Sequence, residues 1–281
     1  MKKKNLLLRF AVLVAAMMCA LGAAAAEAYA CYTPSNTTLT FYYDNYRSSR
    51  TGWTYDLNTG NYSPGWYTDG TNANVSEVKF DPSFTNARPT TCHSWFRDMA
   101  QLQTIYGLNY LNTSAVTHMV SMFRGCSSLT VLDLSSFNTA NVIAMGGMFM
   151  GCSNLRTIYA GSGWSTAAVE ASAGMFSNCT SLVGGQGTAY NSSNPKDKTY
   201  AHIDGGTSNP GYFTAKNASL RGDVNGDGSV SIGDVTALID YLLSGDASGI
   251  NQAAADCNQD NGVSIGDVTA LIDFLLAGSW N

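Results

Sequence analysis

The sequence predicts an α/β chain in two parts: a repeat solenoid with a β-rich N-terminal cap, and then a small all-α domain of paired loop–helix units. A phrase recurs every 26–27 residues from Trp95, and periods in the twenties are typical of solenoids built from a helix plus a short strand. A twelve-residue loop occurs twice, at 223–234 and 256–267, each time before an apolar helical pattern. The predicted divisions are 1–28, 29–90, 91–215 and 216–281.

Residues 1–28 predict a secretory signal peptide. Three lysines precede the apolar stretch 10–21, and small residues at 26–30 offer several cleavage points. The apolar stretch is shorter than the roughly 18 residues that a membrane span needs. We therefore expect a secreted, extracellular protein that associates with the cell surface and has no membrane span. The cleavage point, and lipidation of Cys31, are left open.

Residues 29–90 predict strands that cap the repeats. Leu39 and Phe41, and again Val78 and Phe80, alternate with polar residues, as in strands with one buried face. Such strands would cover the open edge of the repeats. Candidates for surface contacts are the aromatic residues outside the repeat pattern, namely Tyr42, Tyr43, Tyr46, Trp53, Tyr55, Trp66 and Tyr67.

Residues 91–215 predict the repeats and their C-terminal cap. The phrase Met-Phe-x-x-Cys-x-x-Leu begins at Met122, Met148 and Met175, after a degenerate copy at Trp95. We interpret its Met and aromatic positions as core, because packing between stacked copies explains their period. In each copy we expect a helix followed by a short strand. The residues that indicate the helix are Val142, Met145, Met148 and Phe149, and those that indicate the strand are Leu129, Leu132 and Leu134.

Five of the seven cysteines fall into two groups. Cys126, Cys152 and Cys179 occupy equivalent repeat positions, which predicts a buried ladder of small apolar side chains and not disulfides. A disulfide between Cys31 and Cys92 is left open, because their pairing depends on how the fold places them.

The two twelve-residue loops predict two calcium ions, one in each loop. Ca²⁺ takes oxygen ligands, which such a loop supplies from positions 1, 3, 5, 7, 9 and 12. Turn chemistry alone does not require the same oxygen donors twice. Position 6 needs a positive φ, supplied by Gly228 and Asn261. The candidate ligands are Asp223, Asn225, Asp227, Ser229 (carbonyl), Ser231 and Asp234, and Asp256, Asn258, Asp260, Gly262 (carbonyl), Ser264 and Asp267.

An apolar helix face follows each loop, and Gly245 and Gly278 are natural helix ends. With these loops, 221–281 resembles a type I dockerin, a module that docks onto a cohesin domain of a scaffold protein. The resemblance implies metal coordination by the loops and a protein partner. It also implies that loop positions 10 and 11 face that partner: Ile232 and Gly233 in the first copy, Ile265 and Gly266 in the second.

The repeats resemble the leucine-rich repeats of BspA-like bacterial surface proteins. They share the phrase Asn-Thr-x-x-Val-x-x-Met-x-x-Met-Phe-x-x-Cys over roughly 75–215. The resemblance implies a leucine-rich-repeat solenoid, display outside the cell and binding of other proteins, including host matrix proteins.

Composition argues against a nucleic-acid partner and gives little support to catalysis. Residues 29–220 hold ten basic and ten acidic residues, whereas 221–281 holds nine aspartates and one arginine, so no basic stripe could follow phosphates. His93, His118 and His202 form no metal-spaced pair.

We therefore expect an exported, non-catalytic binding protein. Its solenoid would present a face that recognises a protein or a surface, and its calcium-dependent dockerin would dock it to a cohesin-like scaffold. The alternative is an adhesin for host or matrix proteins, with the dockerin as a stabilising tail. A third hypothesis is a component of a carbohydrate-active enzyme, in which carboxylates such as Asp81, Asp98 and Asp133 would converge.

Overall fold

The computed structural model describes residues 25–280 except 217–220, 227–228, 261 and 279. The chain forms two compact units that divide between Thr214 and Ala215. Within the described residues, no helix is both long and apolar enough to cross a membrane. The signal peptide predicted at 1–28 lies mostly outside the described residues.

The first unit is built from short strands and helical turns. The strands expected around Leu39 and Val78 are present as β2 and β4. The strands are β1 (Glu27–Thr33), β2 (Thr38–Asp44), β3 (Trp53–Asp56), β4 (Glu77–Phe80), β5 (Thr104–Tyr106), β6 (Val131–Leu134), β7 (Thr157–Ala160) and β8 (Phe213–Ala215). The helical turns are η1 (Arg47–Ser49), α2 (Gly65–Thr68), η2 (Thr71–Asn74), η3 (Pro82–Asn86), η4 (Leu108–Tyr110), η5 (Lys198–Tyr200) and η6 (Gly206–Ser208).

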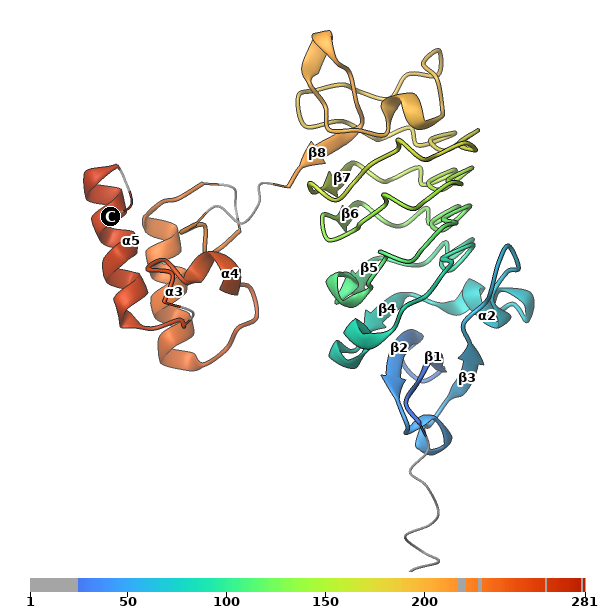
Figure 1. Cartoon of the computed structure of the whole chain (residues 1–281), viewed down its shortest axis with the longest axis horizontal. Coiled ribbons are helices and arrows are strands. Elements are labelled where there is room, and N and C mark those ends of the chain that lie inside the picture. The colour runs from blue at the N-terminus through green and yellow to red at the C-terminus, as the bar shows by residue number, and fades with distance from the viewer. Residues whose placement is uncertain (1–24, 217–220, 227–228, 261, 279, 281) are drawn as a thin grey trace, which may run out of the picture. The chain divides into compact units, whose positions relative to one another are not determined.

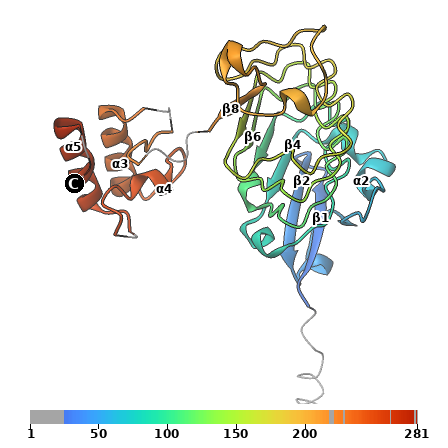
Figure 2. The ribbon, with the colours of Figure 1, turned by 45° about the horizontal axis from the view of Figure 1, so that its top comes forward.

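These strands form two sheets. One sheet has the order β3-β1-β2-β4-β5, in which β1 is antiparallel to β2 and β3, while β2, β4 and β5 are parallel. The other has the order β6-β7-β8, with β6 and β7 parallel. Figure 1 shows β4, β5, β6, β7 and β8 following one another along the unit, and Figure 2 shows strands along one side and the repeated turns along the other.

Backbone hydrogen bonds tie each repeated turn to the next. Met145 and Gly147 donate their N–H groups to the carbonyls of Ala171 and Ala173, one repeat further on, at 2.7 and 3.0 Å. The next residue, Met148, instead donates its N–H to the Met145 carbonyl of its own turn at 3.2 Å. Successive N–H groups therefore donate alternately to a carbonyl of the same turn and to a carbonyl of the next repeat. In this way the buried backbone groups are hydrogen-bonded although the segment is not a helix.

The predicted α/β solenoid of helix-plus-strand repeats is wrong. The first unit is a β-rich fold with two sheets, and α2 is the one α-helix among its described residues. The helix expected across 142–149 is interrupted because Gly147 has φ +59° and Gly151 has φ +80°, a left-handed conformation that no α-helix continues through. Equivalent left-handed residues occur in each repeat, forming one column of Ser94, Ser121, Gly147 and Gly174 and a second of Asp98, Gly125, Gly151 and Asn178.

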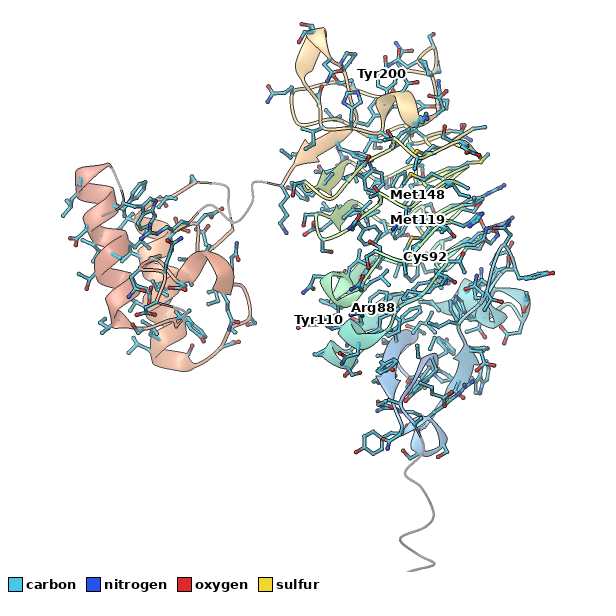
Figure 3. The ribbon with its side chains drawn as sticks, in the orientation of Figure 1. Arg88, Cys92, Tyr110, Met119, Met148 and Tyr200 are labelled. Atoms are coloured by element: carbon cyan, nitrogen blue, oxygen red, sulfur yellow. The ribbon has the colours of Figure 1, made fainter. Side chains whose placement is uncertain are left out.

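The core is a set of side-chain columns that run through the repeats (Figure 3). Phe96, Phe123, Phe149 and Phe176 stack with successive ring centroids 5.3, 5.8 and 5.5 Å apart. The methionines at repeat-equivalent positions, including Met119 and Met148, are fully buried beside them. The interpretation of these positions as core is confirmed, although the backbone that carries them is not helical.

The three repeat cysteines form the predicted ladder. Each is buried and free, and each thiol donates to a carbonyl of the preceding repeat: Cys126 to Phe96 at 3.0 Å, Cys152 to Phe123 at 3.0 Å and Cys179 to Phe149 at 2.9 Å. Burial raises the pKa of all three thiols, which makes them poor nucleophiles. Cys31 and Cys92 are also buried and free, so they form no disulfide here.

A buried carboxylate closes the C-terminal end of the first unit. Asp204 accepts hydrogen bonds from the backbone N–H groups of Gln186, Thr188, Gly206 and Gly211 at 2.8–3.3 Å, and from the Thr188 hydroxyl at 2.7 Å. Burial alone would raise the pKa of this carboxyl, but the hydrogen bonds lower it well below its usual range. One ionised side chain thus holds three irregular segments together.

The second unit contains two long helices, α3 (Ile232–Ser244) and α5 (Ile265–Ala277), with the single turn α4 (Gln252–Ala255) between them. The predicted helix ends are confirmed, because Gly245 and Gly278 are left-handed C-caps. The core is small: Val224, Val235, Leu238, Ala255, Cys257, Val268 and Leu271.

The two ends of the second unit meet at an aromatic clasp. The Trp280 ring stacks on Phe274 with centroids 4.2 Å apart, and the Arg221 guanidinium lies 4.2 Å from the Trp280 ring centroid. Gly222 lies beneath the ring, where a Cβ would come within 2.8 Å of it. The clasp adds apolar contact to a unit whose own core is limited.

Candidate functional site

Each long helix of the second unit begins with a serine–aspartate capping box. Ser231 is the N-cap of α3 and accepts from the Gly233 N–H at 3.1 Å, while Asp234 accepts from the Ser231 N–H at 2.8 Å. Ser264 and Asp267 repeat this arrangement at α5. These four residues, predicted at loop positions 9 and 12, therefore also fix where the helices start.

The same aspartates close the loops. Asp234 and Asp267 are completely buried. The second carboxylate oxygen of Asp234 accepts from the Asn225 N–H at 3.0 Å, and that of Asp267 accepts from the Asn258 N–H at 2.9 Å. Loop positions 3 and 12 are thus adjacent in both copies, so the chain curves around a common centre.

In the second loop, the side chains at positions 1, 3 and 5 converge. The Asp260 N–H donates to Asp256 Oδ1 at 3.1 Å and to Asn258 Oδ1 at 3.0 Å. Asp260 Oδ1 in turn accepts from the Gly262 N–H at 2.9 Å. Asp256, Asn258, Asp260 and Gly262 are thus linked into one hydrogen-bonded turn, in which side-chain oxygens of positions 1 and 3 both face the backbone of position 5.

The first loop is described in part. Asp223 is 5% exposed, whereas Asn225 and Ser229 lie at the surface. Asp227 and Gly228, and Asn261 of the second loop, lie outside the described residues, so the predicted positive φ at position 6 has no test. A left-handed residue that the sequence did not predict occurs at position 4 of both loops: Gly226 with φ +72° and Gln259 with φ +62°.

The residues present fit calcium by their chemistry. Within the described part of the chain, no three His, Cys, Asp or Glu side chains gather as a metal site. Amide, hydroxyl and carbonyl oxygens make up half of the predicted donor set, and hard cations accept these oxygens as readily as carboxylates. When bound, calcium would neutralise carboxylates at positions 1, 5 and 12 that otherwise repel one another.

A duplicated apolar stripe lies on the exposed side of the two helices. Ile232 and Ile265, the predicted partner contacts, are each 73% exposed, and Leu243 and Leu276 are each 82% exposed. Sequence reasoning missed the two leucines, although the 11-residue spacing from each isoleucine, three helical turns, would have found them. Exposed apolar stripes of this kind mark protein-binding surfaces.

The predicted glycines at position 11 have a packing role. A Cβ on Gly233 would lie 3.3 Å from Asn225 Nδ2, and one on Gly266 would lie 3.1 Å from Asn258 Nδ2. Small residues here let the helix start approach the loop closely. Of the residues predicted to face the partner at positions 10 and 11, Ile232 and Ile265 are therefore the ones that expose apolar surface.

The carboxylates considered for catalysis are each engaged locally. Asp81 accepts from the Ser83 N–H at 2.9 Å, and Asp133 accepts from the Ser135 N–H at 3.0 Å. Asp98 pairs with Arg97 at 3.3 Å. Their observed partners are backbone groups and a neighbouring side chain, which explains their positions through turn geometry.

Two family models match the chain. Residues 221–276 match the Dockerin type I domain, and residues 90–207 match "Mycoplasma protein of unknown function, DUF285". Type I dockerin domains bind calcium, and the match indicates a non-catalytic module that docks to a cohesin, in proteins that are typically extracellular or on the cell surface. The second match does not confirm the BspA-like leucine-rich-repeat resemblance. No curated protein and no solved structure matches the chain.

Proposed function

We propose that the chain is an exported, non-catalytic binding protein, docked through its second unit to a cohesin-like domain in a calcium-dependent manner. The dockerin match at 221–276 carries the proposal. The duplicated loops and the duplicated exposed stripe support it, because each would contribute to docking: the loops fix the helix starts, and the helices present Ile232, Leu243, Ile265 and Leu276.

In this proposal each loop holds one calcium ion through the oxygen donors at positions 1, 3, 5, 7, 9 and 12. The first unit supplies the recognition surface, for a protein or for another extracellular surface. Secretion by the N-terminal segment brings both units outside the cell.

The test is capture of the full chain from calcium-containing buffer onto immobilised cohesin domains of type I scaffolds, repeated with EGTA. Calcium-dependent capture, lost in a variant with Leu243→Ser and Leu276→Ser, supports docking through the stripe. Replacing Asp240 and Asp273, exposed helix residues outside the line of the stripe, with serine is the matched control. If cohesins fail to capture the chain while host matrix proteins do so without calcium, the chain is an adhesin and the docking proposal is wrong.

A further inference from the structure

A row of polar and aromatic side chains crosses the outer face of the first sheet. The strand register places Thr40 of β2 beside Lys79 of β4, and Lys79 beside Tyr106 of β5. Tyr42 follows on β2, and Tyr110 enters from η4. Together they line a hollow of about 370 Å³, within the range of small-ligand sites.

Cationic side chains lie over two rings of this hollow. The Arg50 guanidinium covers one face of Tyr42, 3.7 Å from the ring centroid, and the Lys79 ammonium lies 5.6 Å from the ring centroid of Tyr106. Gly107, with φ +66°, lets Tyr110 pack closely, since a Cβ there would lie 3.0 Å from that ring. Tyr106 nevertheless remains 50% exposed. An apolar ring surface is thus kept open to solvent on a rigid strand.

The charges around the hollow are balanced. Lys79 pairs with Glu77 at 2.8 Å, and Arg50 pairs with Asp44. Asp81 also lines the hollow, so an anionic ligand would meet a carboxylate beside every cation. Electrostatic complementarity therefore favours a ligand without net charge.

The backbone beneath most of the hollow cannot take up an added peptide strand. β2 is hydrogen-bonded to β1 and β4, and β4 is hydrogen-bonded to β2 and β5, so neither has a free edge. β5, which carries Tyr106, is the edge strand of this sheet. Over β2 and β4, recognition must come from side chains: flat rings beside hydroxyl, carboxylate and ammonium groups.

We propose that this hollow binds a neutral saccharide. The apolar C–H face of a sugar ring would stack on Tyr106, because the electron-rich face of an aromatic ring attracts weakly positive hydrogens. The sugar hydroxyls would donate to the Asp81 carboxylate, accept from the Lys79 ammonium, and do either with the Thr40 hydroxyl. The inference rests on the recognition role proposed for the first unit and names its ligand class.

The test is affinity electrophoresis of the full chain, with calcium, in gels containing soluble xylan, mannan or mixed-linkage β-glucan. At least one of these is expected to retard the chain. Tyr106→Leu keeps an apolar side chain on β5 but removes the ring, and should weaken retention by about tenfold. Tyr106→Phe should stay within about threefold of the native chain. Tyr62→Ala, which removes a 79% exposed tyrosine outside the hollow, should change nothing.

Three results would overturn the inference: no retardation by any neutral polysaccharide, undiminished retention of Tyr106→Leu, or binding only to polygalacturonate or to polyproline. Circular dichroism of each variant checks that β5 is intact, and loss of retention in Tyr106→Leu counts only if its melting temperature is native-like. If that variant is unstable, Lys79→Met gives the same test from the neighbouring strand. Cohesin capture of the same variants is expected to be native-like, so failure of saccharide binding and failure of docking are separable.

Discussion

The two units both repeat a sequence, but they stabilise the repeats in different ways. In the first unit, each copy passes half of its turn N–H groups to the next copy, and aromatic, methionine and cysteine columns run through all of them. In the second unit, two copies share a core of seven buried residues, and much of the sequence goes into loops with clustered oxygen donors. Stacking supplies its own stabilisation, whereas a pair of loops this small depends on what they bind.

Removing calcium should give the largest difference between the units. With EGTA, repulsion among three carboxylates per loop returns, at roughly 4 kcal/mol per pair for 4 Å and an effective dielectric near 20. We expect rapid proteolysis within 221–281 and little within the first unit, measured by limited digestion and mass spectrometry. Equal cleavage of both units, or of neither, would contradict the comparison.

Replacing the first ligand of both loops should have the next largest effect. Asp223→Ala with Asp256→Ala is expected to abolish calcium uptake and cohesin capture together, because the loops position the helix starts that present the stripe. The matched control is Asp240→Ala with Asp273→Ala, a pair of exposed helix aspartates with the same 33-residue spacing. Calorimetry and capture should show losses in the first pair alone. Intact capture without calcium uptake would separate docking from metal binding.

Asp204→Asn should destabilise the first unit by about 2–3 kcal/mol, because several buried N–H groups lose a charged acceptor. Thermal unfolding of that unit should occur about 5–10 °C lower. Since the folded pKa of Asp204 is lowered, its stabilising effect is present above its unfolded pKa near 3.9 and is lost as pH falls through the folded value. Asp197→Asn, at an exposed cap of η5, should change far less. Equal melting of the two variants at neutral pH would contradict this role.

The smallest effect is expected at a single backbone position. Gly147→Ala places a Cβ at φ +59° and should cost about 1–2 kcal/mol, although its nearest neighbour there would be 3.5 Å away. Gly146→Ala, one residue earlier and without a positive φ, should be neutral or slightly stabilising. Urea unfolding of both variants measures the difference. Identical midpoints would mean that a residue with a side chain adopts the left-handed conformation at position 147 without strain.

Burial could be predicted from the sequence better than backbone conformation. The repeat period identified Met148, Phe149 and Cys152 as core, because equivalent positions recur regardless of how the chain turns between them. The same spacing suggested a helix, since two turns broken at left-handed residues bury side chains at similar intervals. Glycine is replaced at these positions by Ser94 and Asp98 in the first copy, by Ser121 in the second and by Asn178 in the last, which hides the columns in the sequence.

In the second unit, the helix ends at Gly245 and Gly278 were correctly predicted. The helix starts were not, because each helix was expected after its loop, whereas α3 and α5 begin inside the loops, at Ile232 and Ile265. The exposed stripe did not follow completely, because the apolar pattern of the two helices also includes Ile239 and Ile272, which are 37% and 39% exposed. A thirteen-residue helix packed against one neighbour hides a narrow face, so an apolar pattern wider than that face leaves residues in solvent. Because the apolar pattern is wider than the buried face, the sequence did not show which of its apolar residues would be exposed.

Alternate sharing of N–H groups between neighbouring repeats also determines how such a protein can change length in evolution. Gain or loss of a whole 26- or 27-residue copy leaves every donor opposite a suitable acceptor and keeps both ends unchanged. Insertion of a single residue within a copy would shift the phenylalanine, methionine and cysteine columns out of alignment at once. Proteins built from this repeat that differ in size are therefore expected to differ by entire copies.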